Sequence, residues 1–177
     1  MVRFSLFFIA LFSSFVLSAQ SFPEDWIGTY EGKMVIGFTD RPSDSVAVVF
    51  ELQTIEKDSS WTYRMTYTSS RYGVIVKDYI IRRDGNNPAN YLLDEQDGIL
   101  IEMSLMNGCF YDLFEVMDQL YSTTMCMMNG TIRFDLYVSS HSTPLTTNSE
   151  VDEDGNSYQV KSYKPIQHQT VLLTRQM

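Results

Sequence analysis

The chain has 177 residues, a length that predicts one domain with a single sizeable core. It carries 22 acidic against 13 basic side chains, and a surface of that sign repels nucleic acid and anionic lipid, so both kinds of partner are disfavoured. Eleven Tyr and eleven Phe are typical of a β-rich domain.

The first nineteen residues have the pattern of a secretory signal peptide. Arg3 supplies the positive start, residues 4–17 form an apolar run interrupted only by serines, and Ala19 is the small residue before the cleavage site. The alternative, a retained transmembrane anchor, would need about 20 apolar residues. We therefore expect an exported protein, periplasmic or extracellular, with no membrane span after cleavage and residues 20–177 forming one barrel domain. Since Arg3 leaves with the leader, 12 of the 13 basic side chains remain against 22 acidic ones, a net charge of −10.

Almost all of the expected mature chain alternates between apolar and polar residues, as half-buried strands do. In the first such stretch Trp26, Tyr30 and Met34 share one face, and Gly28 and Gly32 between them leave room for bending or for close approach of another backbone. The predicted strands are 26–36, 46–53, 61–67, 74–81, 91–94, 99–105, 109–116, 120–128, 131–138, 158–163 and 166–175. Short antiparallel strands in this number predict an all-β fold that closes on itself.

Two segments depart from that pattern. Residues 112–120 also fit a helical period through Phe114 and Met117, so a helical turn there is a minority alternative. Residues 139–156 are polar and acidic without an apolar period, which predicts a long loop.

The two Asn-Gly pairs, Asn107-Gly108 and Asn129-Gly130, are strong hairpin signals. The register set by the second pair, carried back through a turn at 118–119, places Cys109 and Cys126 on the outer face of the barrel, one diagonal step apart. A slip of two residues would set them directly opposite. In either case a disulfide is within reach, and an exported chain favours one over two free thiols.

The Trp26-x-Gly28 start of the first strand, the meander of strands and Arg175 near the end of the last strand resemble the calycin superfamily of lipocalins and fatty-acid-binding proteins. The chain also resembles secreted proteins of gut-type bacteria. The calycin resemblance implies a closed antiparallel up-and-down β-barrel of about 8–10 strands. It further implies that Arg175 lies across the indole of Trp26 where the last strand meets the first.

Aromatic and Met side chains dominate the inward face. Such residues line adaptable apolar cavities, and they also fill barrels that hold nothing. We expect the cavity to be lined by Tyr30, Trp61, Tyr63, Met65, Tyr67, Met103, Phe110, Phe114, Met125, Met127 and Phe134. The first hypothesis is thus a secreted barrel that holds a small apolar ligand, and the alternative is an interaction or inhibitor barrel with a filled core that acts through its loops.

The sequence favours a non-enzymatic protein over an enzyme, because serine-hydrolase and nucleotide-binding motifs are absent. No catalytic residue, metal ligand or cofactor is assigned. A third hypothesis rests on His168, since a late His after a Gly-containing first strand is similar to the nitrobindin family of haem barrels, where a late His ligates iron. Residues 150–161 begin like a calcium loop, but Lys161 stands where a bidentate Glu is required. The oligomeric state is not predicted.

Overall fold

A computed structural model describes residues 21–85 and 87–176, so the signal peptide expected at residues 1–19 lies outside the described residues. The described chain forms thirteen strands and no helix. The strands are β1 (Gly28–Phe38), β2 (Asp44–Leu52), β3 (Thr54–Glu56), β4 (Ser60–Ser69), β5 (Gly73–Arg83), β6 (Asn90–Asp94), β7 (Leu100–Met106), β8 (Cys109–Val116), β9 (Gln119–Met128), β10 (Thr131–Ser140), β11 (Leu145–Asn148), β12 (Gln159–Ser162) and β13 (Pro165–Arg175). Within this part of the chain, no helix is long and apolar enough to cross a membrane.

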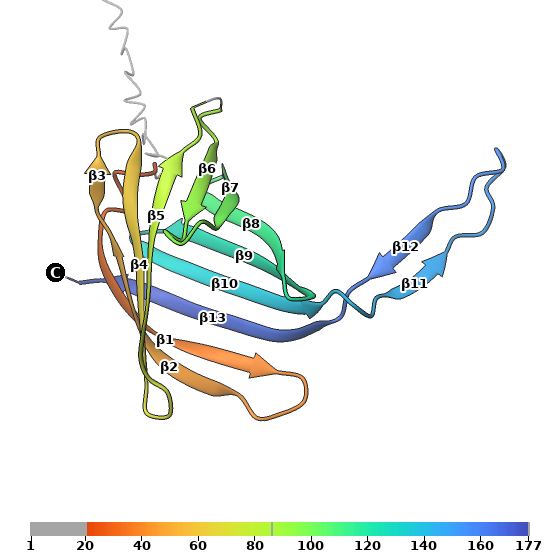
Figure 1. The fold of residues 1–177 in the computed structure, drawn as a ribbon, viewed down its shortest axis with the longest axis horizontal. Helices are drawn as coiled ribbons and strands as arrows, with labels where there is room; N and C mark the ends of the chain where they lie inside the picture. Colours follow the sequence, from red (N-terminus) through yellow and green to blue (C-terminus); the bar gives the residue numbers. More distant parts are fainter. Residues whose placement is uncertain (1–20, 86, 177) are drawn as a thin grey trace, which may run out of the picture.

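Ten of these strands close into an antiparallel barrel, as the sequence predicts (Figure 1). Around its circumference the order is β1-β13-β10-β9-β8-β7-β6-β5-β4-β2, and β2 returns to pair with β1. The short strand β3 adds to the edge of β4 outside this ring. All neighbouring strands are antiparallel, and the first and last strands of the chain are direct neighbours.

The seam between β1 and β13 depends on a glycine. Gly32 lies so close to β13 that a Cβ atom built on it would stand 2.3 Å from the carbonyl oxygen of Leu172 and 2.7 Å from a methyl group of Val171. No side chain fits there, so the glycine allows the two backbones to approach. This is the close approach that the sequence predicts for the apolar face of the first strand.

One end of the barrel is filled by aromatic rings packed edge to face. Phe22, just before β1, lies at the centre of this cluster, with ring centroids 4.8 Å from Trp61, 5.3 Å from Tyr91 and 4.9 Å from Phe110. Trp26 packs against Phe110 at 5.4 Å and is fully buried. Such edge-to-face contacts add to the energy of burial itself, so this end is a solid core.

The prediction of a long loop at 139–156 is partly wrong. Residues 145–148 form β11, which pairs with β12 in a separate two-stranded sheet that projects from the barrel (Figure 1). The expected barrel strand at 158–163 is therefore the return strand of this hairpin. The helical alternative for 112–120 is also wrong, because the segment turns from β8 into β9.

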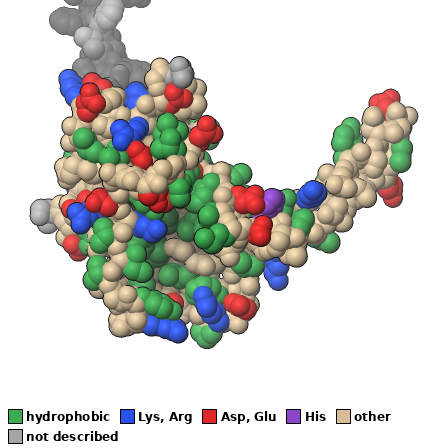
Figure 2. Space-filling view, in the orientation of Figure 1, with side chains coloured by type: hydrophobic (Ala, Val, Ile, Leu, Met, Phe, Trp, Pro, Cys, Tyr) green, Lys and Arg blue, Asp and Glu red, His purple; other side chains and the backbone are tan. Residues whose placement is uncertain are grey.

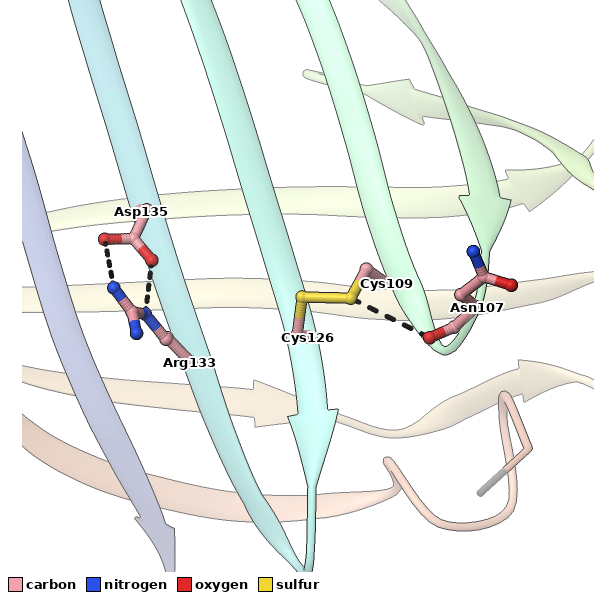
Figure 3. Close-up of a disulfide and its surroundings, with 5 residues drawn as sticks. All are labelled: Asn107, Cys109, Cys126, Arg133 and Asp135. Atoms are coloured by element: carbon pink, nitrogen blue, oxygen red, sulfur yellow. Dashed lines mark hydrogen bonds and ion pairs between the residues drawn. A yellow bond between two sulfur atoms is a disulfide. The ribbon is translucent and has the colours of Figure 1, made fainter. Parts of the chain in front are cut away.

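Cys109 and Cys126 form a disulfide between β8 and β9 (Figure 3). The two residues are directly opposite in the ladder rather than one diagonal step apart. The reason is the turn, which is Met117-Asp118 instead of 118–119, with both residues at positive φ as a type I′ hairpin turn requires. Moving a two-residue turn by one position shifts the strand register by two.

Candidate functional site

The wall of the barrel is incomplete on the side of the β6–β7 hairpin. β5 has eleven residues, but only its last four, Ile80 to Arg83, pair with the five-residue strand β6. On the other side, β7 pairs with β8 only as far as Tyr111. The rest of β5 and the second half of β8 therefore face each other below the hairpin without a strand between them. We call this gap the mouth.

A cavity of about 630 Å³ lies behind the mouth. Its lining residues come from seven strands and the β6–β7 turn: Tyr63, Met65, Tyr67, Lys77, Tyr79, Leu93, Glu95, Ile99, Leu100, Ile101, Asp112, Phe114, Glu115, Val116, Tyr121, Thr123, Phe134 and Leu136. Figure 2 shows hydrophobic side chains gathered in the hollowed middle of this face of the barrel. The volume falls within the range of small-molecule sites, and the lining is mostly apolar with a few polar groups, as such sites are.

Aromatic rings make up much of the cavity wall. Tyr63 and Tyr79 stack with centroids 6.3 Å apart, and Phe114 stacks on Tyr121 at 5.1 Å. The hydroxyl of Tyr67 lies 3.0 Å from the sulfur of Met65. Burial raises the pKa of Tyr67 to about 12, and burial likewise raises the pKa of Tyr63 well above its usual value. These phenols therefore stay neutral within the cavity wall.

Charged groups occur at the mouth. The ammonium group of Lys77 donates a hydrogen bond to the hydroxyl of Tyr79, which also contacts Glu95. That hydrogen bond, with the nearby charges of Glu95 and Asp97, raises the pKa of Lys77. Across the mouth, Glu115 binds the imidazole Nδ1 of His141 at 2.7 Å. The nearby negative charges of Glu95 and Asp97 thus stabilise the ammonium group of Lys77.

Asp112 is the one acidic side chain deeper in the cavity wall. It follows the alternation of β8, in which Phe110 and Phe114 also point inward. Its Oδ1 atom is enclosed and has no hydrogen-bond partner within the described part of the chain. Burial raises the pKa of the Asp112 carboxyl, and hydrogen bonds from the hydroxyl and amide of Thr123, opposite on β9, only partly offset this.

The residues expected to line a cavity divide into two groups. Tyr63, Met65, Tyr67, Phe114 and Phe134 line the cavity. Tyr30, Trp61, Met103, Phe110, Met125 and Met127 are buried, and they lie in the solid core instead. Sequence reasoning missed Asp112, although the period of two through Phe110 and Phe114 places a carboxylate on the inward face.

Arg175 and Trp26 are both near the seam, but the arginine has a different aromatic partner. Its guanidinium lies over the ring of Tyr30, with the central carbon 5.2 Å from the centroid, and the described residues include no such contact with Trp26. Tyr30 is the direct ladder partner of Arg175. The last strand does pair with the first, as expected, but the aromatic ring that Arg175 contacts across the seam is that of Tyr30 and not that of Trp26.

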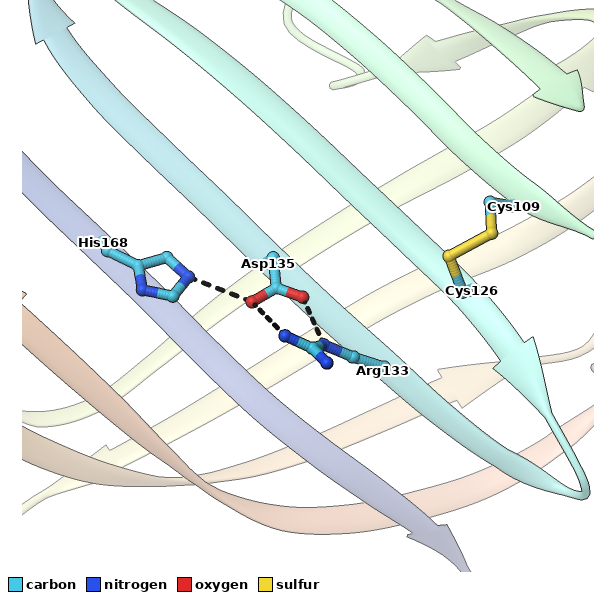
Figure 4. A network of polar contacts seen from close by, with 5 residues as sticks. All are labelled: Cys109, Cys126, Arg133, Asp135 and His168. Atoms are coloured by element: carbon cyan, nitrogen blue, oxygen red, sulfur yellow. Dashed lines mark hydrogen bonds and ion pairs between the residues drawn. A yellow bond between two sulfur atoms is a disulfide. The ribbon is translucent and has the colours of Figure 1, made fainter. Parts of the chain in front are cut away.

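His168 lies on the outer wall of the barrel and does not line the cavity. Its ring stacks on Tyr137 at 4.3 Å, and its Nε2 atom lies 2.9 Å from the carboxylate of Asp135, which Arg133 also binds (Figure 4). Burial alone would raise the pKa of Asp135, but hydrogen bonds from Arg133, Thr170 and His168 lower it below the usual value. These contacts explain His168 as part of an outer polar network, and the haem hypothesis gains no support from its position.

The fold has known counterparts among solved structures. The chain is similar to the S-type phycobiliprotein lyase CPES from Guillardia theta, with a TM-score of 0.61, 8% identity and coverage of 87% of this chain and 90% of that one. It is also similar to a protein of unknown function of the DUF3598 family from Nostoc punctiforme, with a TM-score of 0.57, 12% identity and coverage of 86% of this chain and 48% of that one. These likenesses show that the closed antiparallel β-barrel fold of this chain occurs in other proteins.

Comparisons at the level of sequence add nothing to the fold. No protein-family model matches the chain. No curated protein matches it either.

Proposed function

We propose that this protein is a carrier or receptor that binds a small, largely apolar molecule in the cavity behind the mouth. The observation that carries the proposal is the cavity itself, about 630 Å³ in volume and walled by stacked aromatic rings. A barrel that acts only through its loops has no need of an interior space of this size. Sites of this volume with a mostly apolar lining typically hold one drug-sized molecule.

The likeness to a phycobiliprotein lyase supports a small-molecule role for the barrel, although the identity is only 8%. The mouth gives the cavity an entrance, since Ile99, Leu100 and Val116 on its rim are all substantially exposed. Exposed apolar side chains around an opening are typical of sites through which apolar ligands pass.

A fluorescence titration with the neutral probe N-phenyl-1-naphthylamine tests this proposal. The wild-type protein should bind the probe with about one molecule per chain. Val116→Trp, which puts an indole into the mouth, should weaken binding at least about tenfold, equivalent to about 1.4 kcal/mol. Leu113→Trp is the matched control, because Leu113 is on the outer face of the same strand and 65% exposed. Absence of saturable binding, or equal effects of the two variants, would refute the proposal.

Export from the cytoplasm forms part of the proposal. A disulfide between Cys109 and Cys126 is favoured in an oxidising compartment, and the first nineteen residues have the signal-peptide pattern. Mass analysis of the protein recovered from the periplasm or medium should find a chain that starts near Gln20. A chain that starts at Met1 and stays in the cytoplasm would contradict export.

A second function, as an interaction module, is favoured by the projecting hairpin of β11 and β12. It exposes Leu145, Tyr158 and Val160, although isolated two-stranded hairpins are marginal in water. Deleting 145–162 and joining the ends with a short Gly-Ser linker separates the two functions. Probe binding should survive this deletion if the cavity carries the function.

A further inference from the structure

The cavity wall contains a partly buried acidic group that the binding of a purely apolar molecule does not need. Asp112 lines the cavity between the inward-facing Phe110 and Phe114, and its Oδ1 atom is enclosed without a hydrogen-bond partner among the residues that the structure describes. A carboxylate oxygen without a partner in such a place is destabilising, because the hydrogen bonds that the carboxyl accepts from Thr123 offset only part of the hydration it has lost. A ligand that supplied a positive charge or a strong donor would remove that cost.

The rings around Asp112 are suited to the same kind of ligand. Burial raises the pKa of Tyr63 most, and the neighbouring Tyr67 and then the charge of Asp112 raise it further. Tyr63 therefore lies close to the Asp112 carboxylate. Phe114 and Tyr121 form a stacked pair in the wall. Phe114 is two residues from Asp112 along β8, and Tyr121 lies diagonally opposite Asp112 on β9. The negative faces of aromatic rings attract organic cations, and quaternary ammonium groups are commonly bound in cages of this composition.

The charges that border the cavity have the matching sign. Asp112, Glu95 and Glu115 are acidic, and Lys77 is the one basic side chain of the lining. Lys77 is itself engaged by Tyr79 and by the charges of Glu95 and Asp97. The formal excess of negative charge in the lining repels an anionic ligand and attracts a cationic one, most strongly where solvent is excluded.

We propose that the ligand of this cavity is an organic cation, a protonated or quaternary amine on an apolar or aromatic body, with its positive nitrogen beside Asp112 and its body against the aromatic walls. This inference rests on the proposed function, since it specifies what the same cavity binds. It assigns Asp112 as the residue that determines the charge preference of the site, and Tyr121 and Phe114 as part of its aromatic wall.

The test compares three probes of nearly equal shape at about pH 8, where exposed carboxylates are ionised. They are naphthylmethyl-trimethylammonium, its neutral carbon analogue neopentylnaphthalene, and the anion naphthylacetate. The wild-type protein should bind the cation about tenfold or more tighter than the neutral analogue, and the anion most weakly. Asp112→Asn keeps the shape of the side chain and should abolish the difference between cation and neutral analogue. Glu102→Gln is the control, because Glu102 is exposed on the outer face of β7. This substitution removes one negative charge outside the cavity.

A second variant keeps the test decisive if Asp112→Asn does not fold. Tyr121→Leu retains apolar contact but removes a π face, so it should weaken binding of the cation more than that of the neutral analogue. Equal affinity of the wild-type protein for both probes, or an unchanged preference in both variants, would overturn the inference and leave the proposed function standing. Failure of the wild-type protein to bind even the neutral probe would instead overturn the proposed function.

Discussion

Arg175 binds Tyr30 across the seam where the last strand of the barrel meets the first. The Nη2 atom of Arg175 donates a hydrogen bond of 2.6 Å to the phenolic oxygen of Tyr30, and it also donates to the backbone carbonyl of Asp25. The Tyr30 hydroxyl in turn donates to that same carbonyl at 3.2 Å. A residue two positions from the C-terminus thereby ties β13 to the segment that leads into β1.

Arg175→Ala should lower the free energy of unfolding by about 1–2 kcal/mol, because it removes a cation–π contact and two hydrogen bonds at the seam. Arg175→Lys should recover only part of this loss, since an ammonium group cannot reproduce the planar guanidinium contacts. Thermal and urea denaturation measure both effects. Arg71→Ala is the control, as Arg71 lies over the exposed ring of Tyr72. If both Ala variants unfold like the wild type, Arg175 does not stabilise the seam.

Gly32→Ala should destabilise the barrel by about 1–3 kcal/mol, the usual cost of forcing an extra carbon into a packed site. The new Cβ would stand 2.3 Å from the Leu172 carbonyl oxygen, so the backbone of β1 or β13 must move. Gly37→Ala on the same strand is the matched control, because its Cβ would meet only the His168 carbonyl oxygen at an ordinary 3.7 Å. Urea denaturation of the two variants should separate them clearly. Equal midpoints would show that the strands separate at no cost.

Asp112→Asn should stabilise the ligand-free protein at neutral pH, by about 1 kcal/mol. Burial raises the pKa of Asp112 in the folded state above its unfolded value of about 3.9, so ionising this group favours unfolding. The penalty is absent below the unfolded pKa and complete above the folded pKa. The variant's advantage should therefore vanish in acid and grow as the pH rises above the unfolded pKa of about 4. A constant difference across a melting series that spans this pKa would argue against a buried, ionising carboxylate.

Replacing Cys109 and Cys126 together with Ser should lower stability by roughly 3 kcal/mol in the chain-entropy model, because the bridge closes a loop with a sequence separation of 17 residues. Wild-type protein unfolded with a reducing agent should match the double variant. Thiol labelling of the non-reduced protein gives an independent measurement. Quantitative labelling of both cysteines would mean that the bridge does not form.

The sequence predicted the closed barrel because a period of two and turn residues determine strands and their connections almost locally. The Asn-Gly turns are at positive φ at Asn107, Gly108, Asn129 and Gly130, as their sequence requires. The turn at Met117-Asp118 has no such signal, so its position was misjudged by one residue and the register of the cysteines by two. Of the β11–β12 hairpin, the sequence predicted the second strand, at 158–163, but not β11, because every residue of β11 is exposed and leaves no apolar alternation to detect.

Alternation identifies the face of a strand but not the height of a residue along the barrel. Trp61 and Tyr67 share the inward face of β4, yet Trp61 belongs to the solid core and Tyr67 to the cavity. The difference arises from the short β6–β7 hairpin, which covers only one half of the neighbouring strands. The sequence pattern likewise puts Tyr30 and Trp26 on one face of the first strand, but Trp26 lies in the turn before β1, and the register of β13 pairs Arg175 with Tyr30.

The place of the mouth on the circumference has a mechanical consequence. In the strand order, β6 and β7 lie roughly across the barrel from β1 and β13, so the mouth and the contact between Tyr30 and Arg175 are on opposite walls. Under the proposed function, a ligand would enter through the mouth below the hairpin while the contact between Tyr30 and Arg175 stays intact. Lengthening or shortening the β6–β7 hairpin would then change the size of the mouth while leaving the contact between Tyr30 and Arg175 in place, so under the proposed function this one hairpin would set how readily the ligand enters.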